Sequence, residues 1–476
     1  MPSLKSLAKD TAIYGLSSIV GRFLNYLLVP LYTHRLAAAS GDNGVITNVY
    51  SYTALLLVIL TFGMETSFFR FANKEGEDDW RVYATSLWAV GVVAAVFCML
   101  VWLFLPQIAE PMGYAAHPDF IGVMAIVVAM DAFQSITFAY LRYQKKALKF
   151  AALKLLFIAL NLTLNCAYFL TVEHPDVAYV FYINLLCTAT VQLCFWKELR
   201  AGFMRPDSAV FRRMLSYAWP LLILGIAGIL NQTADKILYP LLRPGHQGQV
   251  ELGIYGGCVK IAMIMALITQ AFRYAYEPFV FGASKEKDNR TTYALAMKYF
   301  IIFTLLAFLC VVGYIDILKY LIGSDYWDGL RVVPIVMAAE IMMGIYFNLS
   351  FWYKLTDRTI WGAILSGIGC AVLIALNIAL VPRFGYDASA WAGFAGYATA
   401  MTLSYIAGQH YYPIRYPLGS IMVYVVLCCG FFAAMRCLPV DWPLAWRLGL
   451  NTLFILAYAA HVVYHEFYKK KHRAKA

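Results

Sequence analysis

The chain has 476 residues, of which 62% are hydrophobic and only 14% are charged. Soluble domains carry roughly a quarter charged residues, so this composition excludes an ordinary soluble protein and indicates a membrane protein. The net charge of +11 does not indicate a nucleic-acid-binding protein, because the basic residues are distributed between long apolar segments in the manner of a membrane protein.

Fourteen apolar segments follow one another along the chain. Each is close to the length of about 20 residues that crosses a bilayer as a helix. They lack the apolar/polar alternation of membrane β-strands, so we predict an all-α, polytopic membrane protein with about fourteen transmembrane helices. The predicted spans are 11–34, 44–69, 82–106, 118–141, 150–171, 177–197, 214–241, 250–280, 292–315, 329–353, 359–381, 388–409, 416–436 and 443–466.

Lys and Arg collect in every second connection between these spans. Of the 38 basic residues, twenty-six fall on one side and seven on the other, the latter being Arg35, Arg243, Lys319, Arg331, Arg383, Arg436 and Arg447. Basic residues are enriched on the cytoplasmic side of membranes, so both termini are predicted to be cytoplasmic. The basic tail from Lys469 is then a solvated segment facing lipid headgroups.

The first apolar segment, after Lys9, is too long for the apolar region of a cleaved signal peptide, and we expect a signal anchor. The ten Cys lie mostly within predicted spans and form no C-x-x-C pair. They therefore predict neither a metal site nor disulfides.

Two halves of the chain share a pattern of Pro and Gly. The first half passes Pro30 and restarts at Gly44, and the second passes Pro240 and restarts at Gly253, which are spacings of 14 and 13 residues. Each half holds six spans, an even number, so the copies enter the membrane in the same direction and form parallel repeats. We predict a six-helix lobe at 1–198, a cytoplasmic linker at 199–213, a second six-helix lobe at 214–410, and two additional helices with the basic tail at 411–476.

Some ionisable residues remain within or near the ends of the spans. A charge at mid-bilayer costs about 2.5–3.5 kcal/mol, so each must face protein or a water-filled cavity. Several share a helix face with neutral polar residues, as Arg22 does with Asn25, and Asp235 with Asn231, which is typical of the wall of a hydrated chamber. The full set is Arg22, Glu65, Asp131, Lys154, Asp235, Lys236, Lys260, Arg273, Glu277 and Glu340.

These charges also have structural interpretations. Arg273 and Glu277 are four residues apart and could neutralise each other. Asp131, with Gln134, could make hydrogen bonds between helices. Lys154 could extend toward the inner surface.

The partners of the remaining charged residues also have to be considered. Glu65 and Glu340 could each bind a coupling ion or pair with a basic residue on another helix. Asp235 and Lys236 project about 100° apart on a helix, so we expect them not to pair with each other. The pattern Gly253-x-x-x-Gly257 indicates close helix packing.

A family resemblance is carried by several short stretches. Lys9-Asp10-Thr11-Ala12-Ile13-Tyr14-Gly15, Leu28-Val29-Pro30-Leu31, Gly44 and Gly63-Met64-Glu65-Thr66-Ser67-Phe68-Phe69-Arg70-Phe71 resemble the N-terminal signature of bacterial polysaccharide flippases of the Wzx type. These belong to the multidrug/oligosaccharidyl-lipid/polysaccharide exporter superfamily. Ala234-Asp235-Lys236, Gly253-Ile254-Tyr255 and Glu277-Pro278-Phe279 are similar to the seventh and eighth helices of that family.

The resemblance implies transport of an undecaprenyl-diphosphate-linked oligosaccharide across the bacterial cytoplasmic membrane by cation-coupled alternating access. It implies the lipid-linked oligosaccharide and the bilayer as partners, with other polysaccharide-assembly membrane proteins as candidates. No nucleic acid, metal or cofactor is expected beyond a coupling proton or sodium ion. The expected substrate contacts are Arg22, Lys236, Lys260, Arg273, Asn25 and Asn231, and the candidate ion-coupling residues are Glu65, Asp131, Asp235 and Glu340.

Three alternatives remain. A lipid II flippase of the same superfamily is disfavoured because Arg22 is the lone arginine of the first span. A cation-coupled multidrug exporter is disfavoured because its cationic substrates would be repelled by basic residues within the spans. An enzyme is disfavoured because no predicted connection can hold a catalytic domain and none of the eight His lies beside a plausible nucleophile.

Overall fold

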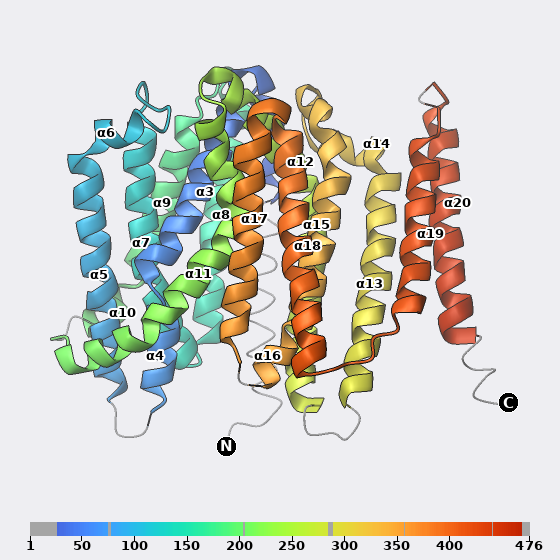
Figure 1. The fold of residues 1–476 in the computed structure, drawn as a ribbon. Coiled ribbons are helices and arrows are strands. Elements are labelled where there is room, and N and C mark those ends of the chain that lie inside the picture. The colour runs from blue at the N-terminus through green and yellow to red at the C-terminus, as the bar shows by residue number, and fades with distance from the viewer. Residues whose placement is uncertain are drawn as a thin grey trace. The chain divides into compact units, whose positions relative to one another are not determined.

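A computed structural model describes residues 26–74, 78–202, 205–283, 289–356, 358–439 and 441–468. Every regular element within these ranges is a helix (Figure 1), which confirms the predicted all-α fold. The chain forms two compact units. The first unit is Met1–Gly256 with Leu373–Tyr386, and the second unit is Gly257–Val372 with Asp387–Ala476. These units are defined by contacts and not by repeats, so the division into lobes around 199–213 stays a prediction.

The first unit holds the N-terminal helices and the beginning of α12. Its elements are α2 Leu28–Arg35, the 3-10 turn η1 Ala38–Ser40, α3 Asp42–Thr61, α4 Met64–Ala72, α5 Asp79–Leu103, α6 Leu105–Ala109, α7 Asp119–Tyr143, α8 Ala147–Thr171, α9 Ala178–Cys194, α10 Trp196–Gly202, α11 Ser208–Leu242 and the first part of α12 His246–Ala283.

The second unit holds the rest of α12 and the C-terminal helices, while α17 contributes to both units. The remaining elements are α13 Asn289–Gly313, α14 Ile315–Leu318, η2 Lys319–Leu321, η3 Ser324–Val332, α15 Val333–Leu349, α16 Phe351–Leu355, α17 Ile360–Phe384, α18 Tyr386–Tyr411, α19 Leu418–Arg436, α20 Leu444–Val463 and the π-helix η4 Tyr464–Tyr468.

Among the described residues, 11 helical segments are long and apolar enough to cross a membrane. Helix α9 is apolar but shorter, and α18 has 26 residues. Together these correspond to every predicted span except the first, of which only the end, α2, is described. The chain is therefore a multi-pass membrane protein.

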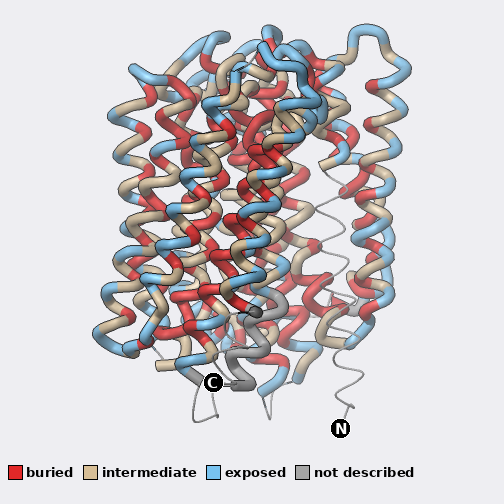
Figure 2. The backbone as a smooth tube through the Cα atoms, turned by 90° about the vertical axis from the view of Figure 1, so that its right-hand side faces the viewer, coloured by how far each residue is buried: buried red, intermediate tan, exposed pale blue. Residues whose placement is uncertain are grey.

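Helix α5 shows how the chain meets lipid. Val92, Val96, Met99 and Leu103 lie along one helix face and are 52%, 44%, 61% and 65% exposed. A continuous exposed apolar face is unfavourable in water but suits the hydrocarbon core of a bilayer. Buried and exposed positions alternate along the other helices too (Figure 2).

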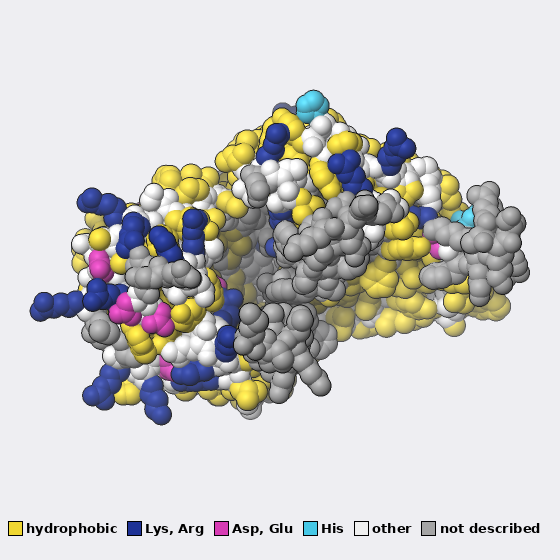
Figure 3. All heavy atoms as spheres, turned by 90° about the horizontal axis from the view of Figure 1, so that it is seen from below, with side chains coloured by type: hydrophobic (Ala, Val, Ile, Leu, Met, Phe, Trp, Pro, Cys, Tyr) yellow, Lys and Arg dark blue, Asp and Glu magenta, His cyan; other side chains and the backbone are white. Residues whose placement is uncertain are grey.

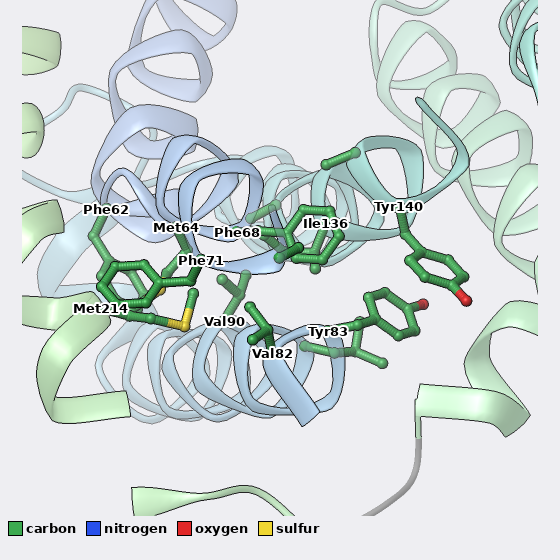
Figure 4. Packing of buried hydrophobic residues seen from close by; sticks show 14 of the residues in the cluster. Phe62, Met64, Phe68, Phe71, Val82, Tyr83, Val90, Ile136, Tyr140 and Met214 are labelled. Atoms are coloured by element: carbon green, nitrogen blue, oxygen red, sulfur yellow. The ribbon is translucent and has the colours of Figure 1, made fainter. Parts of the chain in front are cut away.

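The second predicted span is broken between α3 and α4. Phe62 and Gly63 have φ values of 33° and 74°, in the left-handed region, and a Cβ added at Gly63 would lie 3.0 Å from the carbonyl oxygen of Ala218. The break turns α4 so that fully buried Phe68 packs between α5 and α7 (Figure 4). There the Tyr83 and Tyr140 rings stack with centroids 4.0 Å apart.

Helix α11 begins directly after Asp207, which caps its N-terminus. The Asp207 carboxylate accepts hydrogen bonds from the backbone N–H groups of Ala209 and Val210, at 2.8 and 3.2 Å. These bonds hold the pKa of Asp207 below its usual range. Figure 3 shows Lys and Arg side chains of this unit gathered on the face seen from below, which is the side where α10 and the start of α11 lie in Figure 1.

Candidate functional site

Some predicted residues cannot be placed. Arg22 and Asn25 lie outside the described residues, and the side chain of Glu277 does too. Whether Arg273 and Glu277 neutralise each other therefore stays open. The other predicted residues fall into separate groups within the two units.

Asp235 and Lys236 form an ion pair on α11. The Lys236 Nζ lies 3.0 Å from each carboxylate oxygen of Asp235, and the Tyr255 hydroxyl of α12 donates to Asp235 Oδ2 at 2.8 Å. Our expectation that the two residues would not pair is wrong, because the long, flexible lysine side chain crosses the angle between adjacent helix positions. The positive charge of Lys236 is therefore balanced by the Asp235 carboxylate.

The backbone of α11 around this pair is held by α3. The Asn48 side-chain amide donates to the carbonyl oxygen of Lys236 at 2.8 Å, and the Tyr114 hydroxyl donates to Asn48 Oδ1 at 2.9 Å. Asn231, one turn before Asp235, is also buried, at 7% exposed, and donates to the Ala227 carbonyl oxygen. The predicted polar face of α11 thus points into protein.

Helices α3 and α12 approach each other closely next to this cluster, at Gly44 and Gly253. The Asn43 amide donates to the Gly253 carbonyl oxygen at 2.7 Å. A Cβ added at Gly44 would lie 1.9 Å from the Gln249 carbonyl oxygen, and one added at Gly253 would lie 2.9 Å from the Gly44 nitrogen. Close packing is therefore the role of Gly253, as its motif predicted.

Arg273, on α12 in the second unit, lies beside a small cavity of about 10 Å³. Its guanidinium carbon is 4.7 Å from the centroid of the Phe347 ring. Lys354, Thr269 and Asn348 line the same cavity. The buried Thr269 Oγ1 and Asn348 Oδ1 have no hydrogen-bond partner within the described ranges, so they can still bind a polar group.

Lys260 and Glu340 also belong to the second unit. Lys260 is exposed and Glu340 is half-buried, and each interacts with other groups of the chain. The structure does not bring them to the Arg273 cavity, because neither lines it.

Glu65 pairs with a basic residue on another helix, one of its two predicted alternatives. Its carboxylate accepts a hydrogen bond from the Arg142 guanidinium, which joins α4 to α7. The two side chains are 41% and 34% exposed. The guanidinium carbon also lies 5.0 Å from the centroid of the Phe69 ring.

Asp131 on α7 belongs to a polar network that reaches α9. The Thr188 hydroxyl donates to Asp131 Oδ1 at 3.3 Å, and the Gln134 amide donates to the Thr188 carbonyl oxygen at 2.8 Å. Lys154 lies near enough for its charge to attract Asp131, with its Nζ 4.0 Å from the centroid of the Phe138 ring. The Asp131 carboxylate thus lies next to a neutral hydrogen-bond donor, Thr188, and a cation, Lys154.

Sequence reasoning missed several residues of these groups, among them Thr269 and Asn348 at the Arg273 cavity. Thr188 was passed over because span six holds no charge in its interior, although Asn184 and Thr188 share one helix face. Asn48 and Tyr255 carry no charge either, and Lys354 was assigned to a loop. Only an inventory of neutral polar residues at helical spacing would have found Asn184 and Thr188.

The sequence model of the polysaccharide biosynthesis protein family matches residues 7–274, more than half of the chain. The chain belongs to this family. It is 20% identical over 399 residues to Lsg locus putative protein 1 of Haemophilus influenzae, covering 79% of this chain and 93% of that protein.

Solved structures share the fold. Lipid II flippase MurJ in an inward closed conformation matches with a TM-score of 0.72 and 13% identity, covering 95% of this chain and 98% of that one. An inward-facing multidrug resistance MATE family transporter of the MOP superfamily matches with a TM-score of 0.65 and 14% identity, over 81% and 93% of the two chains. The fold of this chain is thus one that the lipid II flippase and MATE transporter structures also have.

Proposed function

We propose that this member of the polysaccharide biosynthesis protein family is a flippase. It moves an undecaprenyl-diphosphate-linked oligosaccharide from the inner to the outer leaflet of the bacterial cytoplasmic membrane by alternating access. An exchanged proton or sodium ion drives the cycle. Both termini lie in the cytoplasm, as the distribution of Lys and Arg favours.

The observation that carries the proposal is the set of polar side chains that line the Arg273 cavity, at the end of a candidate membrane span. Phosphate oxygens suit the N–H donors of Arg273 and Lys354. A sugar hydroxyl suits Asn348 Oδ1, an acceptor with no partner among the described residues. The site thus offers both chemistries that a diphosphate-linked sugar needs, and the cavity must widen for the substrate to enter.

The proposed coupling residue is Asp131. Glu65 and Asp235 are already engaged in ion pairs with Arg142 and Lys236, so an exchanged cation would have to compete with those partners. Asp131 accepts a hydrogen bond from the neutral hydroxyl of Thr188 and is attracted by Lys154 on α8. A carboxylate in such a setting can exchange a proton or sodium ion and bias two conformations of the protein.

The test is transport by the purified full-length chain in proteoliposomes. A fluorescent undecaprenyl-diphosphate oligosaccharide should appear in the opposite leaflet at a rate that depends on an ion gradient. Arg273→Gln should lower the rate about tenfold or more, the loss expected for one charge-assisted hydrogen bond. Arg383→Gln, at an exposed arginine outside the cavity, is the matched control.

The alternative substrates are tested in the same vesicles. Lipid II and a cationic dye should move more slowly than the lipid-linked oligosaccharide. Equal or faster transport of either would overturn the proposed substrate, and an unchanged rate for Arg273→Gln would overturn the proposed site.

A further inference from the structure

Basic residues are scarce on the side opposite the predicted cytoplasmic face, yet they gather at one cavity. Of the seven Lys and Arg assigned to that side, four line a single cavity of about 420 Å³ in the second unit. The four are Lys319, Arg331, Arg436 and Arg447. A chance distribution of so few charges would not place most of them around one opening.

The four cations come from separate elements. Lys319 begins η2, Arg331 belongs to η3, Arg436 ends α19, and Arg447 lies in the first turn of α20. Helices α19 and α20 are the two predicted to lie outside both repeats. These additional helices therefore supply half of the positive charge at the cavity.

Two carboxylates, Asp316 and Asp328, line the cavity together with the four cations, so positive charge is in excess there. Asp316 is shared, since Arg447 hydrogen-bonds it and the Lys319 Nζ lies 3.5 Å away. Arg331 pairs with Asp387 at 2.9 Å. Arg436 is exposed and makes no ion pair with any described residue. An anion at the cavity would therefore interact with Arg436 without breaking an existing pair.

The cavity lies at the level of lipid headgroups. Arg436 and Arg447 mark the adjoining ends of two membrane spans. Below them α19 exposes Val426 at 63%, and α20 exposes Leu453 at 60%, so both helices face hydrocarbon. Trp327, whose indole N–H donates to the Lys319 carbonyl oxygen at 3.0 Å, is the kind of residue that anchors a chain at this interface.

We propose that this cavity binds the phosphate group of a lipid in the outer leaflet. A lipid phosphate lies at the depth of the four cations, and Arg and Lys are its usual ligands. The phosphate belongs to a membrane phospholipid or to a polyprenyl carrier. The site is independent of the transport site around Arg273, and it gives the two additional helices a function.

The test is lipid retention by the full-length protein in detergent, measured by native mass spectrometry. The probes are phosphatidylglycerol, undecaprenyl phosphate and diacylglycerol, the last of which has acyl chains but no phosphate. Arg436→Gln removes no ion pair and should fold normally, which the thermal unfolding temperature checks. Arg383→Gln removes an exposed arginine of the same predicted side that does not line the cavity.

At least one phosphate-bearing lipid should bind the parent chain and Arg383→Gln equally, and Arg436→Gln about tenfold more weakly. Selective binding of phosphatidylglycerol identifies a membrane phospholipid as the occupant, and selective binding of undecaprenyl phosphate identifies the carrier. Equal binding by Arg436→Gln and the parent chain would overturn the proposal. So would equal loss in Arg383→Gln, or retention of diacylglycerol to the same extent.

Discussion

Gly44 and Gly253 contact each other through their backbones, and they occupy equivalent positions in the two predicted repeats. A Cβ at Gly253 would lie 2.9 Å from the Gly44 nitrogen. Residues related by a twofold axis meet each other only next to that axis. If the two halves are parallel repeats, which stays a prediction, this contact places their axis next to the two glycines.

This contact predicts that no side chain larger than that of glycine fits at position 44. Gly44→Ala should destabilise the protein by about 1–3 kcal/mol, because the added methyl group overlaps the Gln249 carbonyl oxygen of α12. Thermal unfolding of the purified variant measures the loss. Gly228→Ala on α11 is the matched control, since an added Cβ there meets nothing within 4 Å. If both variants unfold at the same temperature, α3 and α12 are not in contact as described.

The ion pair of Asp235 and Lys236 predicts non-additive mutations. Asp235→Asn leaves the Lys236 ammonium without its partner in a largely buried place, and should cost up to about 3–5 kcal/mol. Adding Lys236→Met removes the unpaired charge and should restore part of the stability. A double-mutant cycle from thermal unfolding measures the coupling. Strictly additive losses would show that the two charges do not interact.

Glu65 and Asp131 are distinguished by the pH dependence of transport. Glu65→Gln breaks a half-exposed pair and should cost less than about 1 kcal/mol, leaving the pH dependence intact. Asp131→Asn should flatten the pH dependence, because the variant has no carboxylate to protonate at the proposed coupling site. Transport rates in proteoliposomes over a range of pH compare the two. A flattened profile in Glu65→Gln alone would transfer the coupling role to Glu65.

A buried pair holds the end of the last helix. Glu466 in η4 is 5% exposed, Lys298 on α13 is 4% exposed, and the two are hydrogen-bonded. The Tyr424 hydroxyl of α19 also donates to Glu466, at 2.8 Å.

Removing the Glu466 charge should therefore loosen α20. Glu466→Gln leaves Lys298 buried without a counter-charge and should cost about 3–5 kcal/mol. Tyr424→Phe removes one hydrogen bond and should cost about 0.5–1.5 kcal/mol. Thermal unfolding compares the stabilities of the two variants. Amide hydrogen exchange in α20 shows whether the lost stability is local to that helix. Equal stability of Glu466→Gln and the parent chain would contradict the buried pair.

The helical fold could be read from the sequence almost completely. A bilayer accepts only segments that satisfy their own backbone hydrogen bonds, so length and hydropathy alone identify each span. Gly253 was also identified as a packing residue, because a helix surface without side chains has few other uses. The break at Phe62 and Gly63 was not predicted, since only contact with Ala218 makes a left-handed turn useful there.

The partners of the charged residues were decided by tertiary structure. Sequence alone determined that Glu65, Asp131, Asp235 and Lys236 lie within spans, because hydropathy is a local property. It did not determine that Glu65 meets Arg142, nor that Lys319, Arg331, Arg436 and Arg447 meet at one cavity. Electrostatic interactions depend on distance in space, and distances between helices arise only when their faces pack.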